Sequence, residues 1–307
     1  MISTFIPIAI ATDKNYVEPA LVLVTSILEN KGEDTHIEFN VMISDDVENE
    51  NKEKFKILVS KYKCSNVIFH NMGSAYKEYD FYTNHYYAKP ASFYRLSLPS
   101  VLPNTEKVIY LDVDTIVNSD LEEMFNTDME DYYVAGVSEL KLALKSINID
   151  GVNNKVKVSK FTPICSGVLI MNLKKMREDK IEEEFKKYLK SVDCERFEQV
   201  LLDQDAVNFV CMNKFKLIHP KYSMFSFEYQ NPKATTIPNI YKSVLTQKEW
   251  ENAVKSPVIF HFNSSTKPWK YSDTDPYPIN VWHKYKNIKD KKLGLANKCT
   301  QSYTIIV

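Results

Sequence analysis

The first half of the chain alternates between short apolar runs and amphipathic stretches. The apolar runs at 5–11, 36–43 and 67–69 have the length of buried strands. Between them, 18–30 and 47–62 repeat apolar side chains at helical spacing, so each is predicted to be a helix. This order predicts an α/β fold with an open, mixed but mainly parallel sheet and helices on both faces.

The rest of the chain continues the pattern and then becomes irregular. Further strands are predicted at 107–111, 133–137 and 164–173, and further helices at 90–98, 174–190 and 197–212. The Tyr- and Asn-rich loop at 76–87 is long enough to be functional, and 141–162 are expected to be an irregular insert.

The C-terminal part is predicted to be an appendage. Beyond 262 the pattern degrades, and 282–298 carry six Lys against a single Asp. We expect a single Rossmann-like domain at 1–270 and a helical, basic tail at 271–307. With Trp282 and Tyr285, the tail is suited to lie on an anionic membrane, although a solvated surface helix has the same composition.

Composition excludes several classes of protein. With 39 basic and 40 acidic residues among 307, the chain lacks the basic excess of nucleic-acid binders, so no nucleic-acid partner is expected. The six glycines are too far apart for a dinucleotide-binding or P-loop motif. The five cysteines form no CxxC, and no apolar run approaches about 18 residues. Together with an N-terminus that lacks a basic region, these features predict a cytoplasmic protein.

Two carboxylates follow the apolar strand predicted at 107–111. Asp112 and Asp114 come at its carboxyl end, where open α/β sheets bind ligands. Their oxygens suit Mg²⁺ or Mn²⁺ bridging to a phosphate. A strand-end turn would use the same residue type, so the pair by itself leaves both interpretations open.

Three other positions have the same ambiguity. Asp13, Asn15 and Tyr16 follow the first strand and suit a ribose and a base, yet they also suit a turn. His261 follows an apolar run and can complete a carboxylate metal site, with Lys267 near a diphosphate, or it can be a core histidine. The acidic residues at 203–205 suit a ligand or the capping of a helix.

Six short motifs together resemble one known family. They are ATDKNY at 11–16, SFYRL at 92–96, YLDVD at 110–114, SGVLIMNL at 166–173, DQD at 203–205 and HFNSSTKPW at 261–269. In this order and spacing they resemble glycosyltransferase family 8, the retaining bacterial galactosyl- and glucosyltransferases with their glycogenin-like relatives. The resemblance spans about 7–269 and implies a fold of the GT-A type.

The resemblance also implies a role for individual residues. The metal ligands, for Mn²⁺ or alternatively Mg²⁺, would be Asp112, Asp114 and His261. The nucleotide would be bound by Ala11, Thr12, Asp13, Asn15, Tyr16, Val113 and Lys267. The donor sugar would be bound by Arg95, Asp112, Ser166, Gly167, Asp203 and Gln204. The catalytic pair would be Asp203 and Gln204, with Gln204 supporting substitution from the face of departure.

The implied activity is retaining transfer of a hexose from UDP-galactose or UDP-glucose to an oligosaccharide or glycolipid. Such an enzyme would serve surface polysaccharide or lipopolysaccharide synthesis or protein-glycan extension, in the cytoplasm or peripherally on the inner face of the cell membrane. Cys165 and Ser264 depart from the Asn and Gly usual in the family. These departures keep a non-catalytic UDP-sugar binder open as an alternative, beside a metal-dependent phosphohydrolase and a self-glucosylating protein.

Overall fold

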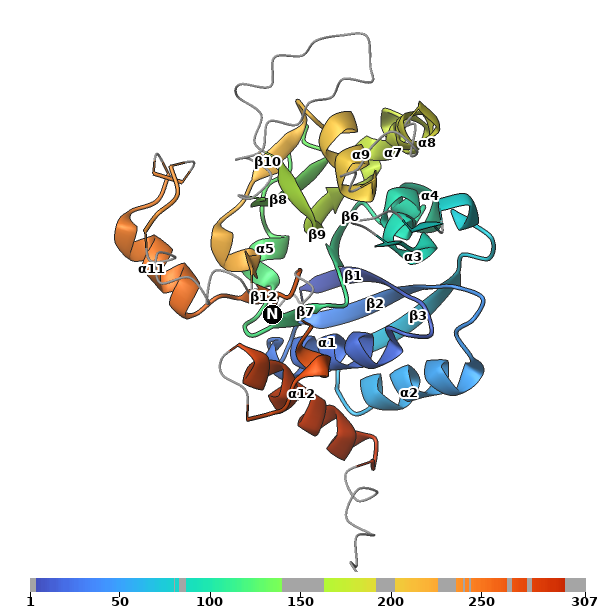
Figure 1. The fold of residues 1–307 in the computed structure, drawn as a ribbon, viewed down its shortest axis with the longest axis vertical. Helices are drawn as coiled ribbons and strands as arrows, with labels where there is room; N and C mark the ends of the chain where they lie inside the picture. The colour runs from blue at the N-terminus through green and yellow to red at the C-terminus, as the bar shows by residue number, and fades with distance from the viewer. Residues whose placement is uncertain are drawn as a thin grey trace, which may run out of the picture.

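The computed structural model describes residues 4–79, 81–82, 87–139, 163–191, 202–225, 236–239, 241–242, 244–263, 267–274 and 278–295. Its centre is a seven-stranded sheet with the strand order β10-β8-β9-β6-β1-β2-β3 (Figure 1). The strands are β1 (Phe5–Thr12), β2 (His36–Ile43), β3 (Ser65–Asn71), β6 (Lys107–Leu111), β8 (Val134–Ser138), β9 (Ile164–Asn172) and β10 (Phe215–Leu217).

The sheet is mixed and mainly parallel, as the sequence pattern predicts. β1 pairs in parallel with β2 and β6, β2 with β3, and β10 with β8. β9 alone is antiparallel to its neighbours β6 and β8. The carboxyl ends of β1 and β6 therefore lie at the same edge, beside the amino-terminal half of β9.

Helices cover both faces of the sheet. On one face, α1 (Val17–Asn30) and α2 (Asn49–Val59) bury Leu21, Val24 and Phe55 against β1 and β2. Several helical segments contribute to the apolar core of the other face. They are α3 (Pro90–Phe93), η2 (Tyr94–Ser97), α4 (Leu98–Val101), α7 (Leu173–Glu178), α8 (Ile181–Ser191) and α9 (Leu202–Val210).

Two predicted helices are interrupted. The helix predicted at 90–98 is three short segments, because Pro99 has no N–H to donate to the carbonyl of Arg95. The N–H of Leu98 bonds that carbonyl instead, which gives the tighter turn of η2. The helix predicted at 174–190 ends at Glu178 and restarts at Ile181, since Lys180 has a positive φ of 55°. Of the helix predicted at 197–212, the part at 197–201 lies outside the described residues.

A second, three-stranded sheet brings distant segments together. It has the order β11-β12-β7, formed by β7 (Thr115–Val117), β11 (Met224–Phe225) and β12 (Ile259–His261). β12 is antiparallel to β7, with His261 opposite Thr115, and the N–H of Phe262 donates to the carbonyl of Asp114. This pairing places His261 directly beside the turn between β6 and β7.

Smaller elements complete the described chain. They are η1 (Lys77–Tyr79), β4 (Phe81–Tyr82), β5 (Tyr87–Ala88), α5 (Glu122–Phe125), η3 (Pro220–Tyr222), α11 (Gln247–Lys255) and η4 (Pro268–Lys270). The loop predicted at 76–87 thus contains η1 and part of the β4–β5 pair, while the insert predicted at 141–162 lies outside the described residues.

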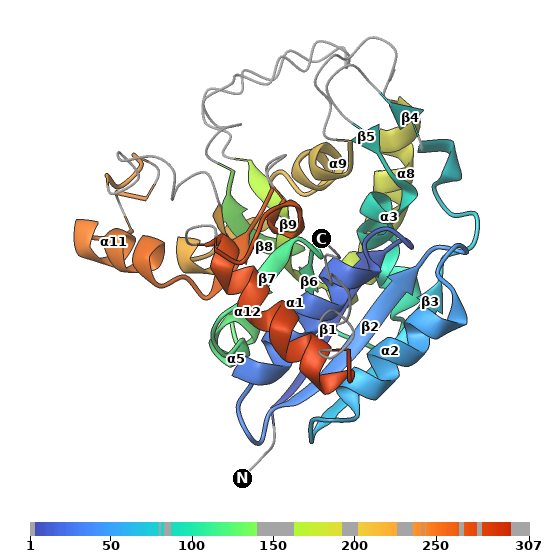
Figure 2. The ribbon, with the colours of Figure 1, turned by 60° about the horizontal axis from the view of Figure 1, so that its bottom comes forward.

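The C-terminal helix α12 (Ile279–Lys292) packs along α1, as Figure 2 shows. Trp282 and Tyr285 are each 1% exposed, and the Tyr285 hydroxyl bonds the side chains of Asn30 and Asn118. The prediction that these two aromatic side chains face a membrane is therefore wrong, because the core of the protein already buries them. None of the described helices has the length and apolar composition needed to cross a membrane.

Candidate active site

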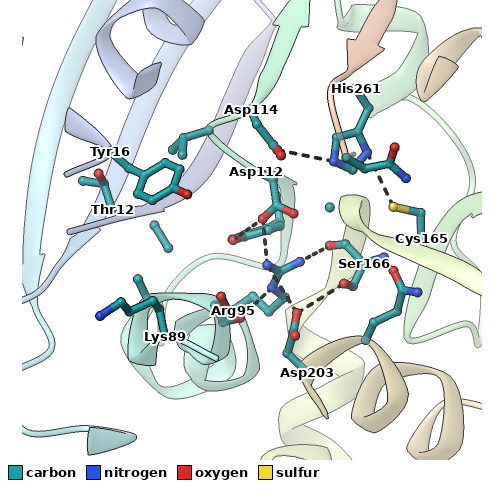
Figure 3. A pocket seen from close by; sticks show the side chains of 18 of the residues that line it. Thr12, Tyr16, Lys89, Arg95, Asp112, Asp114, Cys165, Ser166, Asp203 and His261 are labelled. Atoms are coloured by element: carbon teal, nitrogen blue, oxygen red, sulfur yellow. Dashed lines mark hydrogen bonds and ion pairs between the residues drawn. The ribbon is translucent and has the colours of Figure 1, made fainter. Parts of the chain in front are cut away.

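A pocket of about 540 Å³ opens at the edge where β1 and β6 end (Figure 3). Its wall contains every residue that the sequence singles out as nucleotide-, metal- or sugar-binding. The turn after β1 contributes Asp13, Asn15 and Tyr16, next to Ala11 and Thr12 at the strand end. The remaining elements contribute Arg95 from η2, Asp112, Val113 and Asp114 from the β6–β7 turn, Ser166 and Gly167 from β9, Asp203 and Gln204 from α9, His261 from β12 and Lys267 before η4.

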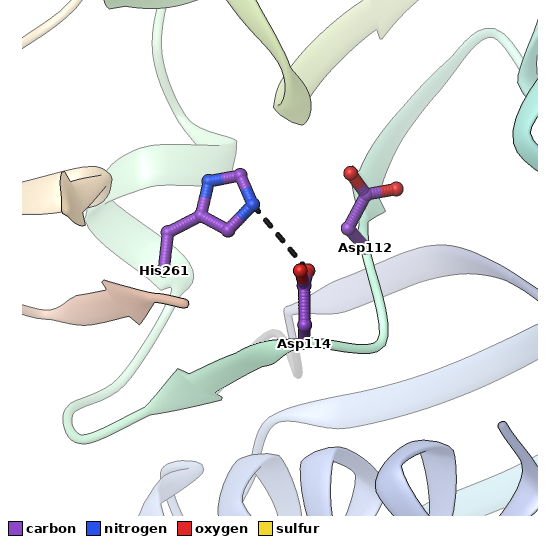
Figure 4. A group of neighbouring side chains, drawn as sticks. All are labelled: Asp112, Asp114 and His261. Carbon is purple, nitrogen blue, oxygen red and sulfur yellow. Dashed lines mark ion pairs between the residues drawn. The ribbon is translucent and has the colours of Figure 1, made fainter. Parts of the chain in front are cut away.

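Asp112, Asp114 and His261 converge at one side of the pocket (Figure 4). One ligand atom from each lies within 4.8 Å of the other two, and His261 Nε2 is 3.4 Å from Asp114 Oδ1. The N–H of Asp112 donates to the carbonyl of Gly167 over 2.7 Å, which fixes the start of the turn. Two carboxylates and an imidazole are a donor set for a divalent cation such as Mn²⁺.

Two further features fit a cation at this place. Apart from the approach of His261 Nε2 at 3.4 Å, the buried Oδ1 of Asp114 has no hydrogen-bond partner among the described residues, which is unusual for a buried carboxylate oxygen. A Cβ built on Gly167 would overlap the His261 ring and lie 2.5 Å from Asp112 Oδ2. Only glycine therefore leaves these two side chains where they are.

Asp114 is held in its charged form. Burial raises the pKa of this carboxyl, but Lys267 and His261 outweigh burial and hold the pKa below its ordinary value. Lys267 Nζ lies 2.5 Å from Asp114 Oδ2 and 2.6 Å from the carbonyl oxygen of Phe262. The ammonium group of Lys267 thus lies at the pocket wall, next to the candidate metal ligands.

Arg95 connects two carboxylates of the pocket. Its guanidinium is 4% exposed, and Nη2 lies 2.7 Å from Asp112 Oδ1 and 3.4 Å from Asp203 Oδ2. Nη1 donates to the carbonyl of Ser166 over 2.5 Å, and the group lies 4.5 Å from the centre of the Tyr110 ring. Arg95 therefore fixes α9 and the β6–β7 turn relative to β9.

Asp203 and Gln204 lie at the start of α9 and point at β9. The Ser166 hydroxyl donates to Asp203 Oδ2 over 3.4 Å, and the Ser166 N–H donates to Gln204 Oε1 over 3.1 Å. One turn later, the Asn208 side chain bonds both the N–H and the carbonyl of Ile164 over 2.8 Å. These bonds hold α9 against β9, and the Asp203 carboxylate and the Gln204 amide line the pocket.

The side chain of Asp13 stabilises the turn after β1. Asp13 Oδ1 accepts the N–H of Asn15 over 2.8 Å, and the Asp13 carbonyl accepts the N–H of Tyr16. The predicted turn and the predicted pocket are therefore both present, formed by the same residues. The Tyr16 ring is partly exposed and meets Trp269 edge-on at 5.8 Å.

Two charged residues of the wall are absent from the predicted set. Lys89 precedes α3, and Glu139 directly follows β8 and is buried, with Asn263 Nδ2 at 3.4 Å from Glu139 Oε2. Glu139 could have been found by the rule that ligands bind at strand ends; no local signal marks Lys89. Cys165 also lines the pocket, whereas Ser264 lies outside the described residues.

Comparisons with known proteins agree on one family. The model of glycosyl transferase family 8 matches residues 7–273. General stress protein A of Bacillus subtilis is 23% identical over 286 residues, which cover 92% of this chain and 93% of that protein. The crystal structure of an active-site mutant of LgtC superposes with a TM-score of 0.75 at 18% identity, covering 92% of this chain and 96% of LgtC.

A further similar structure is longer than this chain. GlyE of Streptococcus pneumoniae superposes with a TM-score of 0.63 at 20% identity, and the match covers 95% of this chain and 62% of GlyE. These likenesses show a shared fold, the mixed α/β arrangement of the GT-A type. With a family model matched over most of its length, the chain belongs to glycosyltransferase family 8.

Proposed function

We propose that this glycosyltransferase is a metal-dependent, retaining enzyme that transfers a hexose from a UDP-sugar to a glycan or glycolipid. The observation that carries the proposal is the convergence of Asp112, Asp114 and His261 on one wall of the pocket, beside Lys267. A divalent cation held there would neutralise charge on a departing diphosphate, which is Lewis-acid assistance to the leaving group. Mn²⁺ is the proposed ion, and Mg²⁺ is compatible with the two carboxylates.

Binding of the nucleotide is assigned to the end of β1 and to Lys267. Tyr16 offers a partly exposed ring for stacking on uracil, and Asp13 and Asn15 offer polar groups for the base and ribose. Ala11, Thr12 and Val113 would form the adjacent wall. Lys267 would meet the diphosphate as a point charge, sharing its ammonium group with Asp114.

The donor sugar is assigned to the opposite wall. Arg95, Ser166 and Gly167 present donors and a close backbone approach there, with Asp112 and the α9 pair beside them. Galactose and glucose are the proposed hexoses. Glu139 and Asn263 also line the pocket, so a bound sugar would be surrounded by polar groups on several sides.

Retention requires either a nucleophile on the far face of the sugar or attack from the face of departure. The carboxylate of Asp203 is paired with Arg95 and accepts the Ser166 hydroxyl, so its charge is already stabilised and its nucleophilicity lowered. The Gln204 amide is a poor nucleophile. These contacts support same-face substitution, with Gln204 stabilising the cation-like transition state. A sugar covalently attached to Asp203, found by intact-protein mass spectrometry, would contradict this mechanism.

A non-catalytic UDP-sugar binder is the second candidate. It is favoured by Cys165, a thiol in the pocket wall where a polar amide would contact a sugar hydroxyl. To separate the two, UDP release is measured with UDP-galactose and UDP-glucose, with Mn²⁺ or EDTA, on wild type and Asp114→Asn. If the protein is an enzyme, UDP release depends on Mn²⁺ and is lost in Asp114→Asn. Binding of UDP without UDP release from either UDP-sugar would favour the non-catalytic binder.

The proposed acceptor and cellular location rest on the C-terminal helix. We propose 1–270 as the catalytic domain and 271–307 as an appendage whose helix α12 docks on α1. The exposed Lys284, Lys291 and Lys292 of α12 would attract anionic lipids at the inner face of the cell membrane, near a glycolipid acceptor. Sedimentation with anionic and neutral vesicles tests this, because equal binding to both would contradict an electrostatic contact.

A further inference from the structure

The imidazole of His261 is contacted on both of its nitrogens. Nε2 faces Asp114, whereas Nδ1 lies 3.5 Å from Cys165 Sγ and 3.4 Å from Ser223 Oγ. Cys165 comes from β9, and Ser223 lies between η3 and β11, so two separate parts of the fold meet behind the ring. Both side chains are buried, so water does not compete for Nδ1.

The other sides of the ring are also occupied. The Phe225 ring lies 5.6 Å from the imidazole, centre to centre, and Gly167 lies against Cε1. The imidazole therefore has little freedom to rotate. The apolar neighbours do not determine which nitrogen of the ring carries the proton. Only the groups that contact Nδ1 and Nε2 determine it.

A histidine that binds a metal through one nitrogen carries its proton on the other. A group that accepts a hydrogen bond from this N–H fixes the tautomer and the ring orientation, and it raises the basicity of the ligating nitrogen. The Ser223 hydroxyl can accept a hydrogen bond, and the Cys165 sulfur is a weaker acceptor. Both lie on the Nδ1 side, opposite Asp114.

We propose that Cys165 and Ser223 are positioning residues that accept a hydrogen bond from the Nδ1–H of His261 and so present Nε2 to the divalent cation. The inference rests on the proposed function, because it requires a cation at Asp112, Asp114 and His261. It gives Cys165 a role behind the ligand rather than toward the sugar. It also assigns a function to Ser223, which lies outside the pocket wall.

The test is the affinity of the purified full-length protein for Mn²⁺ without donor, measured from free Mn²⁺ by electron paramagnetic resonance. We expect Ser223→Ala and Cys165→Ala each to weaken the affinity by ~10–100-fold. Cys165→Asn, which supplies an amide oxygen in a similar volume, should restore the affinity to the wild-type value or above it.

The chain offers matched controls. Ser138 is fully buried and its hydroxyl has no partner among the described residues, so Ser138→Ala removes a buried hydroxyl without touching His261. Cys211→Ala removes a thiol buried in the apolar core under α9. Both should keep the wild-type Mn²⁺ affinity, and thermal melts of all variants exclude those that are unfolded.

The tautomer provides a second measurement, which shows the nitrogen of His261 that binds the cation. In the Mg²⁺-loaded protein with ¹⁵N-labelled histidine, we expect the His261 signals to show a proton on Nδ1 and none on Nε2. If Ser223→Ala and Cys165→Ala bind Mn²⁺ as tightly as Ser138→Ala, the positioning role is wrong while the proposed function stands. If the wild type binds no Mn²⁺, the proposed metal site itself is wrong, and the positioning role falls with it.

Discussion

A single methyl group added at Gly167 should disrupt the proposed metal site and leave the fold intact. In β9, a Cβ on this residue would overlap His261 Cε1 and lie 2.5 Å from Asp112 Oδ2 and 2.9 Å from His261 Nε2. The strand cannot retreat, because it is paired with β6 on one side and β8 on the other. In Gly167→Ala, the two side chains must therefore move instead of the backbone.

The size of that movement follows from the distances. A Cβ is in ordinary contact only beyond 3.4 Å, so the carboxylate and the imidazole must each shift by roughly 0.5–1 Å. Metal–ligand distances tolerate about 0.2 Å, so the shift removes both groups from a common cation. Overpacking of this kind costs about 1–3 kcal/mol of folding free energy, which leaves the protein folded.

The assay is the melting temperature with UDP, in Mn²⁺ and in EDTA. Gly167→Ala should melt several degrees below wild type, at ~2–4 °C per kcal/mol, and should lose the increase in melting temperature that Mn²⁺ gives with UDP. The control is Gly136→Ala, whose Cβ would lie 3.1 Å from Leu169 Cδ2 and 3.3 Å from Ile164 Cδ1 in the core. Gly136→Ala should be destabilised yet keep the increase in melting temperature that Mn²⁺ gives with UDP. If Gly167→Ala also keeps this increase, the predicted displacement of the two side chains is wrong.

Three other changes test the packing, the buried charges and the pH dependence. Trp282→Ala should lower the free energy of unfolding by ~3–5 kcal/mol in urea denaturation, because the side chain is fully packed, 6.0 Å from Trp269 between ring centres; wild-type stability would contradict this. Arg95→Met should cost ~3–5 kcal/mol by removing the buried guanidinium that pairs with the Asp203 carboxylate, and adding Asp203→Asn should recover part of the loss; no recovery would show that this ion pair is not what Arg95 stabilises. Burial raises the pKa of Asp290, but Lys286 and Lys289 outweigh burial and hold it below its ordinary value. Since the pKa of Asp290 is lower in the folded state, its ion pairs with the two lysines stabilise the protein above about pH 4. This stabilisation disappears as the pH falls further. The difference in unfolding free energy between wild type and Asp290→Asn should accordingly shrink between pH 7 and pH 3, and a constant difference would argue against the ion pairs.

Elements with a strong local signal could be predicted from the sequence. The strands at 36–43 and 107–111 have the predicted bounds. Alternation of apolar and polar residues, or an uninterrupted apolar run, indicates which side chains are buried. The strand-end rule correctly placed Asp112 and Asp114 in a pocket, since all parallel strands present their carboxyl ends at one edge. Each of these inferences needs only neighbouring residues and a general rule about sheets.

Features that depend on distant partners could not be predicted in this way. His261 reaches Asp114 only because β12 pairs with β7, strands of three residues each whose pairing no local pattern specifies. The tail looks like an exposed basic helix in the sequence, but Trp282 and Tyr285 are covered by side chains contributed from far earlier in the chain. The contact of Cys165 with His261 likewise arises from tertiary packing alone.

The contacts of Arg95 lie between these two cases. The resemblance places it in the sugar pocket, and the pocket wall includes it. Its bonds to Asp112, Ser166 and Asp203 connect three elements, and their geometry depends on the tight turn that Pro99 imposes on η2. Such a role follows from the packed structure, since the spacing of motifs along a chain says nothing about which side chains touch.

The most direct test of a metal-dependent UDP-sugar site is a thermal-shift titration with UDP, UDP-galactose and UDP-glucose, each with Mn²⁺ and with EDTA. Wild type should show an increase in melting temperature that requires both the uridine ligand and Mn²⁺, equivalent to ~2.7 kcal/mol when the ligand is present at 100 times its Kd. Asp114→Asn should show no such increase. No shift with any uridine ligand, or a shift that is the same in EDTA and in Asp114→Asn, would contradict the proposed site.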